Sequence, residues 1–263
     1  CFEQTTPLNL HRERKMERTL EKLGKQEPTV IVVIGDSCSV DCHWTLGRKN
    51  WVQYLSEALW HTYGDGFITV INSSKCGSSY TSELTRLETS VLRFRPDLVV
   101  SAIGGLAKDK PPKEADLFAT DRAAAREVIK RIQAAGSEIL FITWNPVVYG
   151  YWQPLPEGAR PGEAFPESPA HSEASAKALK DLAEELKLPV VDLYSAWKNH
   201  RIPYRFLTAH PQNLWLWMAD TIHPGPVGHL AFFRTIAAAF KVSPYFPWEH
   251  TPLLEYPDSE KKG

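Results

Sequence analysis

Two kinds of hydrophobic pattern alternate along the chain. Short, continuous and mostly β-branched apolar runs are separated by segments that are apolar only at every third or fourth position. The first pattern is typical of strands buried on both faces, and the second of amphipathic helices. The predicted strands are residues 29–34, 67–71, 97–103, 138–144 and 189–193, and the predicted helices are residues 9–24, 50–63, 82–94, 119–135, 170–188 and 226–241.

Strands that alternate with helices in this way predict a parallel sheet with helices on both faces. We therefore expect an α/β fold, a three-layer α/β/α sandwich with a flavodoxin-like, five-stranded parallel sheet. The 263 residues contain no internal repeat and are expected to form a single domain. Residues 1–27 should be an N-terminal helical extension, residues 148–170 a long proline-rich loop, and residues 243–263 a C-terminal tail.

Composition narrows the classes of function. Thirty Lys and Arg residues balance 31 Asp and Glu residues, which argues against a nucleic-acid partner. No apolar run approaches the ~18 residues that a membrane span requires. The sequence does not indicate an oligomeric state. We expect a cytoplasmic protein, unless Cys1 is the processed, lipid-carrying terminus of a bacterial lipoprotein, which would place the chain outside the cytoplasm.

Cysteines are too sparse for a disulfide-built scaffold, since only Cys1, Cys38, Cys42 and Cys76 occur. The spacing of Cys38 and Cys42 is not one of the usual zinc spacings, so no metal site is expected. We interpret these residues as free thiols. A disulfide from Cys76 to Cys38 or Cys42 is the alternative.

The residues with candidate chemistry lie near the two ends of the predicted fold. Gly35-Asp36-Ser37 follows the first strand, which places the Ser37 hydroxyl on a strand-to-helix turn at the carboxyl edge of the sheet. We expect Asp36 to hold this turn by hydrogen bonding. Near the other end, Asp220 precedes His223 by three residues and could bond its ring nitrogen. Serine, histidine and aspartate in one cleft form the triad of acyl transfer.

In these motifs the sequence resembles the SGNH hydrolases, also called GDSL esterases and lipases, over residues 29–240. Gly35-Asp36-Ser37 resembles the first block of the family, and Asp220-Thr221-Ile222-His223-Pro224 resembles the last. The resemblance implies that Ser37 is the nucleophile, His223 the base and Asp220 the residue that orients it. Gly77, after the second strand, matches the glycine whose N–H serves the oxyanion hole together with that of Ser37. Trp51 and Arg95-Pro96-Asp97 are similar to one bacterial branch of the family.

The third block departs from the family pattern. Where the family has an asparagine that donates to the oxyanion, the alignment on Gly104 places Leu106, which has no donor. Loss of one such donor typically costs about 10²–10³ in turnover. Asn145, after the fourth strand, is our first candidate for a substitute donor. The alternative is that Asn145 only turns the chain before Pro146.

Tryptophan is abundant, with nine residues, and several tryptophans flank the candidate blocks. Trp44, Trp144, Trp152 and Trp217 could stack on sugar rings, although each could also be a core residue. Through the resemblance, we expect a serine esterase that removes small acyl groups, especially acetyl, from a saccharide and needs no cofactor. The alternatives are a general short-chain esterase or lipase and a non-catalytic saccharide-binding relative.

Overall fold

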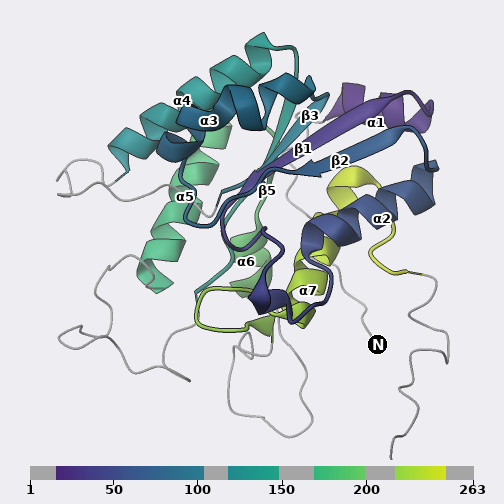
Figure 1. The fold of residues 1–263 in the computed structure, drawn as a ribbon. Coiled ribbons are helices and arrows are strands. Elements are labelled where there is room, and N and C mark those ends of the chain that lie inside the picture. The colour runs from purple at the N-terminus through teal and green to yellow at the C-terminus, as the bar shows by residue number, and fades with distance from the viewer. Residues whose placement is uncertain (1–15, 104–117, 148–168, 199–216, 247–263) are drawn as a thin grey trace, which may run out of the picture.

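A five-stranded parallel sheet forms the centre of the protein (Figure 1). The computed structural model describes residues 16–103, 118–147, 169–198 and 217–246. The strand order is β2-β1-β3-β4-β5, and every neighbouring pair is parallel. The strands are β1 (Thr29–Gly35), β2 (Ile68–Asn72), β3 (Leu98–Ala102), β4 (Glu138–Ile142) and β5 (Val190–Val191). The predicted fold class is confirmed.

Helices cover both faces of this sheet, as Figure 1 shows. On one face lie α1 (Glu17–Gly24), α2 (Trp51–Tyr63), α6 (Leu193–Lys198) and α7 (Pro226–Ile236). On the other face lie α3 (Tyr80–Ser90), α4 (Ala119–Ala134) and α5 (Pro169–Glu185). Short 3₁₀ helices complete the described chain: η1 (His43–Thr45), η2 (Leu92–Phe94) and η4 (Ala237–Phe240).

A hydrophobic core lies on each face of the sheet, and the continuous apolar runs of the strands contribute to both cores. In β1, Ile31 and Val33 point into the core shared with α2 and α7, whereas Val32 and Ile34 point into the core shared with α3 and α4. All four side chains are fully buried. A strand that is buried on both faces needs apolar residues at every position, which is the pattern of residues 29–34.

Most predicted elements appear within a few residues of their expected ends. Helix α3 begins two residues before the predicted segment, because Ser79 and Ser82 form a capping box there. The predicted helix 226–241 changes after Ile236 into η4. The short elements η1 and α6 were not predicted. Of the predicted loop 148–170, residues 148–168 lie outside the described residues, as do the segment before residue 16 and the chain after residue 246.

The topology determines where a site can form. From β1 the chain adds β2 on one side and then β3 on the other, so the strand order changes direction at β1. Open α/β sheets bind ligands at such a switch point, outside the carboxyl ends of the strands. The segments after β1, β2 and β4 therefore meet at one edge. Among the described helices, none is both long and apolar enough to cross a membrane.

Candidate active site

Ser37 lies half-buried on a tight turn directly after β1. The Cys38 N–H donates to Asp36 Oδ1 at 2.8 Å, and the Ser39 N–H donates to the Asp36 carbonyl at 3.0 Å. The turn also requires a glycine at position 35, since a Cβ there would lie 2.5 Å from Ser39 Oγ. Asp36 thus holds the turn, as the sequence predicted.

Side chains from α2 and β2 anchor the far end of this turn. The Trp51 indole N–H donates to Ser39 Oγ at 3.1 Å, and the Asn50 and Asn72 amides donate to the Ser39 carbonyl at 3.3 and 2.7 Å. The turn does not lead directly into a helix. The next α-helix, α2, begins at Trp51 and is capped by Asn50, so its positive end does not start at Ser37.

Asp220, His223 and Ser37 form a continuous hydrogen-bonded row. His223 Nδ1 lies 2.7 Å from Asp220 Oδ2, and His223 Nε2 lies 2.9 Å from Ser37 Oγ. The other carboxylate oxygen, Asp220 Oδ1, accepts the N–H groups of Ile222 and His223 at 2.8 and 2.7 Å. With Nδ1–H donating to Asp220, Nε2 is left free to accept the proton of Ser37.

The charge of Asp220 is well stabilised. Burial by itself would raise the pKa of Asp220, but the hydrogen bonds from the His223 ring and from two backbone N–H groups outweigh it and lower the pKa to about 2. The carboxylate is therefore ionised at neutral pH.

Backbone contacts fix the turn that carries His223. The Ala219 N–H donates to the His223 carbonyl at 2.8 Å, and the Gly225 N–H donates to the Trp217 carbonyl at 2.7 Å. Helix α7 then packs against this turn so closely that a Cβ on Gly228 would lie 2.0 Å from the Trp217 carbonyl oxygen. A glycine is required there for the helix to approach.

Two buried side chains converge on the carbonyl of Ile222, next to His223. Asn145 Nδ2 donates to it at 3.0 Å, and the Cys38 thiol donates at 3.8 Å. Asn145 Nδ2 also donates to the Pro146 carbonyl at 3.2 Å. Both contacts of the Asn145 amide thus point to protein carbonyls. In this geometry Asn145 supports the His223 turn, and its service as an oxyanion donor stays a prediction.

The loop between β2 and α3 carries Gly77 at the same edge of the sheet. Gly77 is exposed and has a φ of +68°, a conformation that glycine adopts readily. The loop is tied to the β1 end, because the Lys75 N–H donates to the Gly35 carbonyl at 2.9 Å. Leu106, at the third block, lies outside the described residues.

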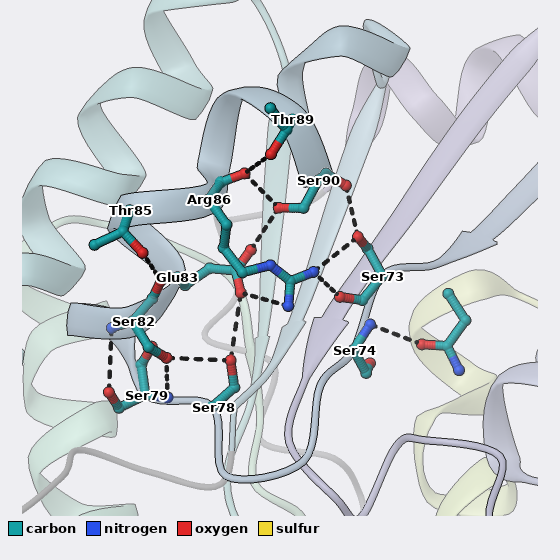
Figure 2. Close-up of polar contacts among 11 residues, drawn as sticks. Ser73, Ser74, Ser78, Ser79, Ser82, Glu83, Thr85, Arg86, Thr89 and Ser90 are labelled. Carbon is teal, nitrogen blue, oxygen red and sulfur yellow. Dashed lines mark hydrogen bonds and ion pairs between the residues drawn. The ribbon is translucent and has the colours of Figure 1, made fainter.

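A polar network behind this loop joins it to α3 (Figure 2). Arg86 donates to the carbonyl and hydroxyl of Ser73 at 2.5 and 3.2 Å. Ser78 and Ser90 donate to the buried carboxylate of Glu83 at 3.4 and 3.0 Å, and Arg86 lies 3.7 Å from the same carboxylate. Burial raises the pKa of Glu83, although Arg86 and the two serines oppose this effect. The network connects both ends of the loop that holds Gly77.

The candidate substrate residues have different environments. The half-buried Trp144 ring meets His171 edge to face, with centroids 6.1 Å apart. Trp217 packs edge to face on the buried Trp197 at 5.0 Å, as a core residue would. Trp152 lies outside the described residues. The assignment of these three tryptophans to substrate binding therefore stays a prediction.

Trp44 makes the contact that the sequence did not reveal. Its ring stacks on the His223 imidazole, with centroids 3.5 Å apart and planes 11° apart. The sequence placed Trp44 near the site as a possible sugar contact. A stack on the base depends on how η1 folds back, which no motif specifies.

The thiols near the site are not joined. Cys38 is buried, Cys42 half-buried and Cys76 exposed, and all three are free. Burial raises the pKa of the Cys38 and Cys42 thiols, so both stay protonated at neutral pH. Nowhere in the described segments do three or more metal-ligating side chains gather.

His229, on α7, is a packed residue rather than a second base. It is 1% exposed, and burial together with the nearby His223 lowers its pKa to about 4. It is therefore neutral at pH 7.

The comparisons with known proteins agree with this fold. An acetylxylan esterase from Geobacillus stearothermophilus superposes with a TM-score of 0.60 at 20% identity, covering 86% of this chain and 99% of that one. A protein called TesA gives 0.52 at 20% identity, with 81% and 98% covered. A two-domain esterase active on acetylated mannans gives 0.59 at 14% identity, with 86% of this chain and 52% of that chain covered. No curated protein sequence matches the chain.

The family comparison covers most of the sequence. The sequence model of the GDSL-like lipase/acylhydrolase family matches residues 33–231, a range that includes Ser37, Asp220 and His223. The solved structures above are too distant in sequence to show more than the fold, and that fold is the α/β sandwich of SGNH-type esterases. The chain therefore belongs to the GDSL-like lipase/acylhydrolase family and is a serine ester hydrolase.

Proposed function

We propose that this protein removes acetyl or similarly small acyl groups from carbohydrate esters through an acyl-enzyme on Ser37. The observation that carries the proposal is the row of hydrogen bonds from Asp220 through His223 to Ser37 Oγ. This is the constellation that activates a serine for acyl transfer.

In the proposed first step, Ser37 Oγ attacks the ester carbonyl carbon while its proton passes to His223 Nε2. The carbonyl oxygen becomes an oxyanion, which the N–H groups of Ser37 and Gly77 stabilise. The bond to the sugar oxygen then breaks, and His223 returns the proton to that leaving oxygen. The product at this stage is an acylated Ser37 and a free sugar hydroxyl.

In the second step, water attacks the acyl carbon and gives a proton to His223. The bond between the acyl carbon and Ser37 Oγ breaks, Ser37 recovers its proton and the carboxylic acid leaves. Asp220 stays ionised throughout and stabilises the imidazolium formed in each step.

Two groups of structural relatives, an acetylxylan esterase and an esterase active on acetylated mannans, support the triad and the carbohydrate part of the proposal. Solved structures of the acetylxylan esterase include mutants described as catalytic, in which a serine, an aspartate or a histidine is replaced by alanine. The last two lie three positions apart in that protein, as Asp220 and His223 do here. Another relative is described as active on acetylated mannans.

The test compares wild type, Ser37→Ala and the control Ser243→Ala. The hydroxyl of Ser243 donates to the Tyr245 carbonyl, away from the site. Wild type and the control should hydrolyse an activated aryl acetate, and Ser37→Ala should not. If Ser37→Ala is as active as wild type, Ser37 is not the nucleophile. If no ester is hydrolysed faster than in buffer, the catalytic proposal is overturned.

A substrate panel then tests the acyl and alcohol parts. Acetylated xylo- and manno-oligosaccharides should be deacetylated with higher kcat/KM than aryl esters of longer fatty acids. A preference for the longer acyl chains would overturn the carbohydrate assignment and favour a general esterase.

A further inference from the structure

The imidazole of His223 is held at its two ring nitrogens, by Asp220 at 2.7 Å and by Ser37 at 2.9 Å. These bonds lie at nearly opposite ends of the ring. They fix an axis through the imidazole but resist rotation about that axis only weakly, because the angular dependence of hydrogen bonds is shallow near their optimum. The bond from the ring to Cβ limits this rotation in part, and a contact on the face of the ring restricts the tilt further.

Trp44 supplies such a contact. Its indole lies parallel to the imidazole, with centroids 3.5 Å apart and an angle of 11° between the planes. Trp44 is itself half-buried and also touches His43, with centroids 4.2 Å apart. The face of His223 that Trp44 covers is closed to water.

The backbone around Trp44 is held firmly. Thr45, 1% exposed, donates from its N–H and its hydroxyl to the Cys42 carbonyl at 3.0 and 2.8 Å. Leu46 then ends η1 in the left-handed region, with a φ of +50°. The element η1 also packs against α7, the helix that packs against the turn of His223.

The stack matters most when His223 is charged. Each step of the proposed reaction passes a proton to Nε2 and converts the imidazole into a cation. The face of an indole attracts a cation through its quadrupole, and the attraction grows when water is excluded. Trp44 should therefore stabilise the transition state more than the resting enzyme.

We propose that Trp44 is a positioning residue for His223: it fixes the tilt of the imidazole and stabilises the imidazolium that forms during catalysis. This inference rests on the proposed function, in which His223 is the base.

The experiment measures kcat and KM on an activated aryl acetate for Trp44→Leu and Trp44→Phe, with circular dichroism to confirm folding. Trp44→Leu keeps an apolar side chain but removes the aromatic face, so kcat should fall about 2- to 30-fold with KM unchanged. Trp44→Phe keeps an aromatic face and should recover most of this loss. The matched controls are Trp60→Leu and Trp60→Phe, since Trp60 is 45% exposed on α2 and bonds the Ile68 carbonyl. Both should leave kcat at the wild-type value.

Two results would overturn the inference. Equal kcat values for wild type, Trp44→Leu and Trp44→Phe would mean that the stack contributes nothing. A rise in KM at unchanged kcat would mean that Trp44 contacts the substrate instead of acting through the base. Ser37→Ala, measured beside them, separates this inference from the proposed function. Activity in Ser37→Ala would overturn both, whereas an inactive Ser37→Ala with a fully active Trp44→Leu would overturn the role of Trp44 alone.

Discussion

The two halves of the site are built in different ways. We call the residues around the proton path the base side: Ser37, Asp220, His223, Trp44 and Asn145. There, Asp220, His223, Ser37 and Trp44 meet through their side chains, and the Asn145 amide donates to the backbone carbonyl of Ile222. The chemistry of this side therefore depends on which side chains are present.

The oxyanion side is the loop of residues 73–79, which carries Gly77. Its proposed donor is a backbone N–H, so its chemistry depends on the path of the chain and not on a side chain. That path is held from behind by the Glu83 and Arg86 network of α3, as Figure 2 shows. The chemistry of the base side thus depends on the identity of its side chains, whereas that of the oxyanion side depends on the conformation of a loop.

The largest effect is expected on the base side, from Asp220→Asn. An amide at this position removes the negative charge beside His223 and can donate to Nδ1, which would stabilise the wrong tautomer. We expect kcat on an activated aryl acetate to fall about 10³- to 10⁴-fold, with little change in KM. The control is Asp181→Asn, whose carboxylate pairs with Lys177 on the exposed face of α5. A loss of less than about tenfold would contradict the role of Asp220.

The difference between the sides also explains what could be predicted from the sequence. The β-branched runs identified all five strands, because a doubly buried strand needs apolar residues throughout. Ser37, Asp220 and His223 could be singled out from the sequence because the proposed chemistry requires those residue types, and the structure brings their side chains together. The short elements η1 and α6 have too few residues for a periodic pattern.

Contacts between distant segments were harder to predict. The stack of Trp44 on His223 joins residues 179 positions apart through a 3₁₀ turn that leaves no sequence signal. Asn145 was placed at the correct edge of the sheet, but the sequence could not show that its amide meets the Ile222 carbonyl. Such contacts depend on packing after the fold has formed.

A smaller effect is expected from Asn145→Ala, which tests the side to which Asn145 belongs. On the base side, the substitution leaves the half-buried Ile222 carbonyl with the distant Cys38 thiol as its remaining donor among the described residues. The free energy of unfolding should then fall by about 1–3 kcal/mol. The His223 turn should loosen, and kcat should fall about tenfold.

A role of Asn145 in the oxyanion hole predicts different changes in kcat and in the free energy of unfolding. If Asn145 donates to the oxyanion instead, kcat should fall about 10²- to 10³-fold. The unfolding free energy would then change little. Urea unfolding and kcat measured on the same preparation distinguish the two, and the second result would move Asn145 to the oxyanion side.

The smallest effect is expected on the oxyanion side, from Glu83→Gln. Burial raises the pKa of Glu83 above its usual 4.5, so the folded protein binds this proton more tightly than the unfolded chain does. The contribution of Glu83 to stability therefore falls as the pH rises from 4.5 through the raised pKa of the folded state. Glutamine has no proton to lose, so the stability of Glu83→Gln relative to wild type should increase over that interval, as urea unfolding at a series of pH values would show.

Because glutamine can still accept from Ser78, the Gly77 loop should keep its path and kcat should stay near that of the exposed control Glu88→Gln. A kcat loss as large as that of Asn145→Ala would mean that the Glu83 charge itself is needed to hold the oxyanion loop.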